Sequence, residues 1–296
     1  MSFSRPQQGL AAAFAAVIIW ALVPVGTRFF VLRVDPFLFN VIRFAASGAA
    51  AMPLFLRARP WRWPATDRML LFGCAVLAIP GYNLPVAWAA QTVPAGQLGL
   101  LIATEPAFIV VLTLILNRQP IHRRVWAGSA LALAGVALTS QGPLPPHGSG
   151  WFSTVQVLGG AASWSCYTVL AAGLNRRYGA FGVTGAIVVV GTVVLLAISL
   201  PLMPAVAMPD PTTTGLLAGM GLASSLLGFL LWNYAGARVP AERMGLALYL
   251  IPIVCVLAGV GFLGESLTGL IIAGGALTVF GVWVAAGVRD PRDDAD

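Results

Sequence analysis

Residues 95–116 read Ala95-Gly-Gln-Leu-Gly-Leu-Leu-Ile-Ala-Thr-Glu105-Pro106-Ala-Phe-Ile-Val-Val-Leu-Thr-Leu-Ile-Leu116, a long apolar run with a single charged residue. A helix of roughly 20 mainly apolar residues crosses about 30 Å of hydrocarbon, so the run predicts a membrane-spanning helix. Glu105 would lie deep in the bilayer, where an acid normally faces a protein interior or a wet cavity. Pro106 beside it lacks a backbone donor and disturbs the helix. The pair indicates a polar feature near the middle of a membrane protein.

The composition of the whole chain favours the same class. Of its 296 residues, 58% are hydrophobic and 9% are charged, whereas a soluble domain is about a quarter charged. The net charge of +7 comes from 17 arginines and no lysine. These arginines lie between apolar runs, which is typical of membrane topology and contact with anionic lipid rather than of nucleic-acid binding. Cys74, Cys166 and Cys255 have no metal or redox spacing, and we expect no cofactor and no metal.

Apolar runs of span length follow one another along the chain. No signal-peptide cleavage pattern precedes the first of them, which we therefore expect to be retained. Breaks at charged, proline and glycine positions predict helices at about 10–31, 36–56, 69–91, 95–117, 124–141, 151–173, 182–203, 214–237, 241–263 and 267–288.

The arginines predict how these helices are oriented. With the N-terminus in the cytoplasm, fourteen arginines fall on the cytoplasmic side, whereas only Arg28 and Arg33 fall outside and Arg43 lies within the second span. Positive charge collects on the cytoplasmic side of membrane proteins. The expected fold class is therefore an all-α integral membrane protein with ten transmembrane helices and both termini cytoplasmic.

An internal repeat divides the chain into two halves. A shift of 146 residues aligns 88–138 with 234–284 without a gap, and 14 of these 51 positions are identical, where about five are expected by chance. Each half holds five expected helices, an odd number, so the halves must have opposite orientations. Inverted repeats are typical of secondary transporters, whose binding site lies between the halves near the midplane. We expect a first repeat at 9–141, an inverted second repeat at 151–288 and a short cytoplasmic tail at 289–296, around a central cavity.

Motifs from both halves carry a family resemblance: Trp20-Ala-Leu-Val-Pro24, Arg43-Phe44, Thr104-Glu105-Pro106, Tyr249-Leu-Ile-Pro252 and Leu263-Gly-Glu-Ser-Leu-Thr268. Through them the chain resembles the EamA-type members of the drug/metabolite transporter superfamily, over about residues 9–288, and within that group it is similar to bacterial exporters of aromatic amino acids. It departs from the pattern at 117–120, where Asn-Arg-Gln-Pro replaces a Gly-Glu pair, and its second half has no counterpart of Arg43-Phe44. The resemblance implies export of small metabolites or drugs across the bacterial inner membrane and no ATP-binding domain.

The third expected span contains Ile79-Pro80-Gly81-Tyr82-Asn83-Leu84-Pro85. Two prolines and a glycine predict a broken helix, and broken helices usually line a cavity. Tyr82 is a candidate to stack on a flat substrate and Asn83 to hydrogen-bond its polar end. The alternative for Asn83 is that its side chain satisfies the broken backbone.

Aromatic residues at mid-depth add to the candidate site. Trp20 and Trp164 occupy similar positions in the first and sixth spans, too deep for an interfacial belt, so they face either the cavity or a neighbouring helix. Tyr167 follows one turn after Trp164, and Tyr249 precedes Pro252 in the ninth span. The candidate substrate-binding residues are Trp20, Tyr82, Asn83, Glu105, Trp164, Tyr167 and Tyr249, and the candidate hinges are Pro24, Pro80, Gly81, Pro85, Pro106 and Pro252.

Glu105 has three possible roles. Arg43 lies about 10 Å and Glu105 about 15 Å below the outer boundary at 1.5 Å per helical residue, so the two are candidates for a buried charge pair. Glu105 could instead hold a substrate ammonium group or exchange protons to drive transport.

Glycines recur at seven-residue spacing in the fifth and tenth spans, at Gly128, Gly135, Gly274 and Gly281. Small residues let helices approach closely. These helices therefore form either a packing core or a homodimer surface away from the cavity.

The pattern as a whole favours a secondary transporter that works by alternating access on a small, partly apolar solute, either an aromatic or other hydrophobic amino acid or a flat drug-like compound. Ser224 and Ser225 are further polar groups for a zwitterion. A passive channel-like facilitator is the alternative. An intramembrane enzyme is disfavoured, because His122 and His147 fall in expected loops and no aspartate lies within an expected span.

Overall fold

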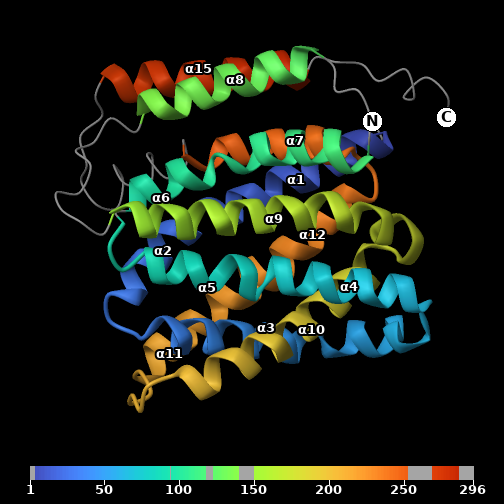
Figure 1. Cartoon of the computed structure of the whole chain (residues 1–296), viewed down its shortest axis with the longest axis vertical. Coiled ribbons are helices and arrows are strands. Elements are labelled where there is room, and N and C mark those ends of the chain that lie inside the picture. Colours follow the sequence, from blue (N-terminus) through green and yellow to red (C-terminus); the bar gives the residue numbers. More distant parts are fainter. Residues whose placement is uncertain (1–3, 94, 118–122, 140–149, 253–268, 287–296) are drawn as a thin grey trace.

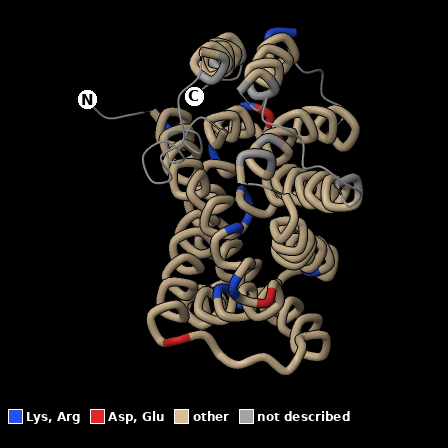
Figure 2. The backbone as a smooth tube through the Cα atoms, turned by 90° about the vertical axis from the view of Figure 1, so that its left-hand side faces the viewer, with Lys and Arg blue, Asp and Glu red and all other residues tan. Residues whose placement is uncertain are grey.

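The computed structural model describes residues 4–93, 95–117, 123–139, 150–252 and 269–286, and every structural statement below concerns these residues. Within them the regular elements are helices, which lie side by side with their axes along one common direction (Figure 1). Figure 2 looks along that direction and shows a mostly tan tube with charged residues at few places.

Several expected spans of the first half are each made of two helices. The elements are α1 (Arg5–Ala21), α2 (Val23–Val31), α3 (Pro36–Ala58), the short 3-10 helix η1 (Pro60–Arg62), α4 (Ala65–Ala78), α5 (Pro80–Ala89), α6 (Ala95–Ile102), α7 (Glu105–Asn117) and α8 (Arg123–Thr139). The first, third and fourth expected spans are thus α1–α2, α4–α5 and α6–α7.

The second half contains longer helices and one π-helical segment. Its elements are α9 (Gly150–Tyr178), α10 (Ala180–Leu202), α11 (Pro211–Gly221), the π-helix η2 (Leu222–Leu227), α12 (Gly228–Gly236), α13 (Ala241–Gly245), the 3-10 helix η3 (Leu246–Tyr249) and α15 (Gly269–Ala286). The remainder of the ninth expected span and the motif at 263–268 lie outside the described residues.

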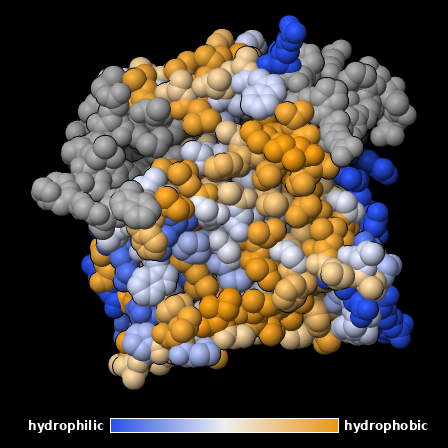
Figure 3. All heavy atoms as spheres, in the orientation of Figure 1, coloured by the Kyte–Doolittle hydropathy of each residue, from blue (hydrophilic) through white to orange (hydrophobic). Residues whose placement is uncertain are grey.

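Among the residues that the structure describes, six helical segments are long and apolar enough to cross a membrane: Arg5–Val31, Pro36–Arg62, Ala65–Ala89, Phe152–Tyr178, Ala180–Leu202 and Pro211–Gly236. The space-filling view shows apolar residues across most of one face and hydrophilic ones mainly along its left and right margins, where the helices end (Figure 3). An integral membrane protein fits both observations. The ten-helix count and the location of the termini stay predictions.

Prolines account for the interrupted spans. Pro24, Pro80 and Pro106 each occupy the first or second position of the helix that follows a break, at Leu22, at Ile79 and at 103–104. The first turn of a helix tolerates proline because its backbone N–H groups have no intrahelical acceptor. Proline cannot, however, donate the backbone hydrogen bond that would continue the preceding helix. Pro85 lies inside α5, which continues past it.

The glycines of α8 and α15 pack these two helices against each other, at the top of Figure 1. A Cβ atom at Gly281 would lie 2.5 Å from the backbone nitrogen of Ala132 and 2.6 Å from the oxygen of Gly128. A Cβ at Gly135 would lie equally close to Thr278. Of the two sequence-based alternatives, the packing core is therefore the one observed. The glycine faces are turned toward each other within one chain, and a homodimer through these helices stays a prediction.

Candidate substrate-binding cavity

A cavity lies among helices from both halves of the chain. Its volume is about 50 Å³, room for only a few water molecules at roughly 10–15 Å³ each, whereas sites for small molecules usually span about 300–1,000 Å³. Side chains of the wall must therefore move before a small molecule can enter. The lining residues are Trp20, Val23, Pro24, Thr27, Phe39, Arg43, Tyr82, Asn83, Val86, Ala87, Ile102, Glu105, Trp164, Ser224, Ser225, Phe229, Leu248 and Ile251.

Arg43 of α3 is the one arginine in this lining, and its side chain is 3% exposed. Its Nη2 donates a hydrogen bond to Ser224 Oγ at 3.1 Å, and its guanidinium lies 4.9 Å from the centre of the Phe39 ring. Such a cation–π contact stabilises a cation that has left water. Arg43 Nε has no hydrogen-bond partner among the described residues. A buried donor of this kind is costly unless a ligand or water accepts from it.

The π-helix η2 presents Ser224 and Ser225 to the cavity. π-helical turns occur frequently at functional sites because they shift the following side chains and free a backbone carbonyl. Here Trp20 Nε1 donates to the Ser224 carbonyl at 2.8 Å. Gly228 at the end of the π-helix leaves the space that the Trp20 indole occupies.

Glu105 is the first residue of α7 and is 2% exposed. The break before it turns the start of α7 toward the cavity, where the helix dipole favours a negative charge. The Tyr82 hydroxyl is hydrogen-bonded to the Glu105 carboxyl group, and Ser165 Oγ donates to its backbone carbonyl at 3.0 Å. Glu105 Oε1 has no hydrogen-bond partner in the described part of the chain.

The predicted charge pair between Arg43 and Glu105 is not formed. Both side chains line the same cavity, yet among the described residues the ion pair present joins Asp67 and Arg177. Depth along a helix fixes the height of a side chain but not the direction in which it points. Arg43 is turned toward η2, whereas Glu105 is turned toward Tyr82.

Asn83 lines the cavity, and its amide also satisfies the backbone at the break in the third span. Its Nδ2 donates to the carbonyls of Ala78 at 3.3 Å and Ile79 at 3.0 Å. The structural alternative considered for Asn83 is therefore present in the structure. Its contact with a substrate stays a prediction.

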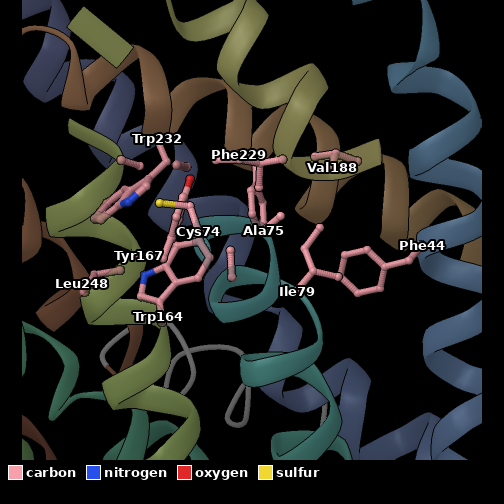
Figure 4. Packing of buried hydrophobic residues seen from close by; sticks show 14 of the residues in the cluster. Phe44, Cys74, Ala75, Ile79, Trp164, Tyr167, Val188, Phe229, Trp232 and Leu248 are labelled. Carbon is pink, nitrogen blue, oxygen red and sulfur yellow. The ribbon is translucent and has the colours of Figure 1, made fainter. Parts of the chain in front are cut away.

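Aromatic rings line one side of the cavity, and Figure 4 shows two of them, Trp164 and Phe229, in one buried cluster with Tyr167 and Trp232. The ring centres of Trp20 and Trp164 are 5.0 Å apart at an interplanar angle of 88°, and Trp164 lies 5.1 Å from Phe229. Such edge-to-face contacts stabilise aromatic clusters beyond their buried area. Trp164 Nε1 is buried without a hydrogen-bond partner among the described residues, so it is a third polar atom available at the wall.

Two candidate residues lie away from the cavity. Tyr167 is buried behind Trp164, where its hydroxyl donates to Asn233 Oδ1 at 2.9 Å. Tyr249 is buried in a separate cluster with Ala103, Ala132 and Leu246. In this structure neither side chain belongs to the lining of the cavity, and contact of Tyr167 and Tyr249 with a substrate stays a prediction.

Some lining residues were missed although the sequence held a signal for them. Phe229 is the counterpart of Asn83 under the 146-residue shift, one turn before the aligned block. Phe39 precedes Arg43 by one helical turn, so a shared face was foreseeable. Thr27 and Leu248 carry no such signal. In the described parts of the chain, no group of three or more His, Cys, Asp or Glu side chains could hold a metal ion.

Comparisons with known proteins agree with this architecture. The profile of the EamA-like transporter family matches the chain twice, over residues 7–141 and 151–287. A probable terminal-alkyne amino-acid exporter of Streptantibioticus cattleyicolor is 32% identical over 241 residues, 80% of this chain and 78% of that protein.

Other relatives cover more of the chain at lower identity. The uncharacterized inner membrane transporter YedA of Escherichia coli K12 is 28% identical over 268 residues, 87% of this chain and 83% of that protein. A probable amino-acid metabolite efflux pump of Salmonella typhimurium is 24% identical over 289 residues, 92% of each chain. One crystal structure, 20% identical in sequence, superposes with a TM-score of 0.76 over 94% of this chain and 96% of that chain, which shows a shared fold.

Proposed function

Because the chain belongs to the EamA-like transporter family, we propose that it exports amino acids with aromatic or other apolar side chains by alternating access, without ATP. Its relatives are transporters and exporters rather than enzymes, and it is a multi-pass protein of the bacterial inner membrane. Two relatives are named as a probable amino-acid exporter and a probable amino-acid metabolite efflux pump, and these names support amino acids as the substrate class.

The observation that carries the proposal is that Arg43 and Glu105 are buried in one cavity and do not neutralise each other. An α-amino acid is a zwitterion and needs a partner for each charge. Arg43 would take the carboxylate, since a guanidinium presents planar donors that match it. Glu105, with Tyr82 beside it, would take the ammonium group.

The aromatic wall supplies contact area for the side chain of the substrate. Trp20, Trp164 and Phe229 offer ring faces and edges, and aromatic pairs gain about 0.5–1.5 kcal/mol beyond burial of their area. Trp164 Nε1 is available as a further donor to the carboxylate.

The interrupted spans provide the flexibility that alternating access requires. Breaks at Leu22, Ile79 and 103–104 each lie within a few residues of the cavity lining. Pro24, Pro80 and Pro106 follow these breaks and lack the backbone donor that would continue the preceding helix. Hinges of this kind let one part of a bundle move against another while the helices stay intact. Movement of the wall would also enlarge the cavity to admit the substrate.

Counterflow into proteoliposomes tests the pairing of charges. We compare phenylalanine with its amide, which lacks the carboxylate, and with N-acetylphenylalanine, which lacks the ammonium group. A hydrogen bond to a charged group contributes about 1.5–3 kcal/mol, so the wild type should prefer phenylalanine by about 10- to 100-fold over either analogue. Arg43→Gln should no longer distinguish phenylalanine from its amide but should still discriminate against N-acetylphenylalanine. Glu105→Gln should show the opposite pattern.

Arg33→Gln is the matched control, because Arg33 is exposed and donates to the Phe29 carbonyl outside the cavity. It should keep both discriminations. Uptake that neither saturates nor exchanges would favour a passive channel and refute the carrier. If Glu105→Gln abolished the pH dependence of transport for all three compounds, Glu105 would couple protons rather than bind the ammonium group.

A further inference from the structure

A cluster of polar side chains is buried behind the aromatic wall. This cluster, which we call the Asn233 cluster, consists of Tyr167, Asn175, Thr184 and Asn233, each at most 3% exposed. Asn233 Oδ1 accepts from Tyr167 Oη at 2.9 Å and from Asn175 Nδ2 at 2.8 Å. Asn233 Nδ2 donates to Thr184 Oγ1 at 3.0 Å. One amide thereby joins α9, α10 and α12.

The Asn233 cluster separates two hollows. On one side, the Tyr167 ring contacts the cavity residues Trp164 and Phe229, with ring centres 5.0 and 5.9 Å apart. On the other side, Asn175 forms part of a cleft of about 1010 Å³ at the end of the molecule where α1 begins. Arginines from three segments border this cleft: Arg5, Arg176 and Arg238.

Helix packing alone does not account for the cluster. The same helices α9 and α12 are already joined by a hydrogen bond from Trp232 Nε1 to Thr168 Oγ1 at 3.1 Å and by the aromatic cluster. Polar side chains inside a membrane bundle are expensive and usually mark pathways. Moreover, Asn175 Oδ1 is buried beside the cleft without a hydrogen-bond partner among the described residues.

The two halves of the chain differ at this point. The 146-residue shift places Ala87 opposite Asn233, and Ala87 lines the cavity. The hydrogen-bonded amide of Asn233 thus lies toward the end of the molecule that carries the N-terminus, whereas the corresponding side chain in the first half is the methyl group of Ala87. The hydrogen bonds therefore favour closure on one side of the cavity over closure on the other.

We propose that the Asn233 cluster is the inner gate of the substrate path between the cleft and the cavity. In this structure the gate is shut by its three hydrogen bonds. When α9 and α12 move apart, these three hydrogen bonds break. The freed amide and hydroxyl groups can then bind the polar end of the passing amino acid, which lowers the free-energy cost of breaking the bonds. This inference rests on the proposed transport function and adds the route by which the substrate reaches the cavity.

Thiol labelling tests the gate without any substrate. In a chain whose three cysteines are replaced by alanine, Ser225→Cys reports on the cavity and Ser4→Cys, in a separate sample, identifies the face that carries the N-terminus. A membrane-impermeant maleimide is applied to right-side-out and to inside-out vesicles. Asn233→Leu removes three hydrogen bonds, so labelling of the cavity cysteine from the N-terminal face should rise about tenfold.

Thr168→Val is the matched control, since it removes a hydrogen bond between the same two helices and leaves the Asn233 cluster intact. Its labelling should stay within about twofold of the parent. Tyr167→Phe removes one of the three bonds and should give a smaller increase, which keeps the test decisive if Asn233→Leu does not fold. Equal labelling in the parent, Tyr167→Phe and Thr168→Val would overturn the gate. Counterflow by the parent, measured in parallel, would show separately whether the transport function fails.

Discussion

At the scale of single residues, a glycine beside the cavity makes room for one of its aromatic rings. Gly228 has no side chain, and the Trp20 indole fills the space that a Cβ atom there would take. We predict that Gly228→Ala displaces the indole, breaks its hydrogen bond to the Ser224 carbonyl and pushes the ring into a cavity of only about 50 Å³. The concentration of phenylalanine that half-saturates counterflow should rise about tenfold, as expected for a loss of roughly 1.4 kcal/mol.

Gly219 in the preceding helix offers a control, since a Cβ atom there would meet nothing within 4 Å. Gly219→Ala should leave half-saturation unchanged. Tryptophan fluorescence of the two variants separates displacement of the ring from general instability, because only Gly228→Ala should alter it. An unchanged half-saturation in Gly228→Ala would mean that the Trp20 position is irrelevant to binding.

At this scale the sequence predicted which residues are special better than what they contact. Arg43 and Glu105 stood out as charges within apolar runs, and both do line the cavity. Their direct pairing was wrong because helical depth leaves rotation about the helix axis undetermined. Tyr167 lies outside the cavity lining for the same reason: a residue three positions from Trp164 is rotated by about 60° when each residue turns the helix by 100°.

At the scale of elements, the breaks in the spans position the polar groups. Pro106 cannot donate to the carbonyl of Ile102, so α6 ends and α7 starts afresh with Glu105 at its first position. Replacing it by alanine restores that donor and allows one continuous helix, which would rotate Glu105 relative to Tyr82. We predict that Pro106→Ala lowers counterflow at least about tenfold, in line with the strong dependence of site function on positions of about 1 Å.

Pro53 supplies the comparison, because it lies inside α3, which continues unbroken past it. Pro53→Ala should retain transport. Counterflow rates normalised to protein content, with circular dichroism to check helix content, measure both variants. Wild-type transport by Pro106→Ala would show that the break does not position Glu105.

The elements themselves were largely foreseeable, since long apolar runs and prolines set where helices begin and end. Breaks at 79 and at 103–104 follow from Pro80 and Pro106, and α10 coincides closely with its expected span. The π-helix at 222–227 was not foreseen. Its sequence, Leu-Ala-Ser-Ser-Leu-Leu, has the same apolar periodicity as an ordinary helix. The π-helical turn coincides with contacts from another helix, since the Trp20 indole fills the space beside Gly228 and donates a hydrogen bond to the Ser224 carbonyl.

At the scale of the whole molecule, cavity and support occupy different parts of the bundle. The cavity is built by helices from both halves, whereas α8 and α15 contribute no lining residue that the structure describes and pack on each other. This separation lets the helices around the cavity move while one close contact between the two halves is kept. Stability and substrate recognition should therefore respond to different substitutions.

The contact between α8 and α15 gives the prediction for this scale. Gly281→Leu inserts a large side chain where even a Cβ atom would lie 2.5 Å from the Ala132 nitrogen, whereas Gly275→Leu on the same helix meets open space. Overpacking typically costs about 1–3 kcal/mol, so the melting temperature of Gly281→Leu in detergent should fall by several degrees and that of Gly275→Leu should not. Because these glycines face each other within one chain, light scattering should give both variants the wild-type mass. A change of mass in Gly281→Leu, with its melting temperature unaltered, would instead assign the glycines to an interface between two copies.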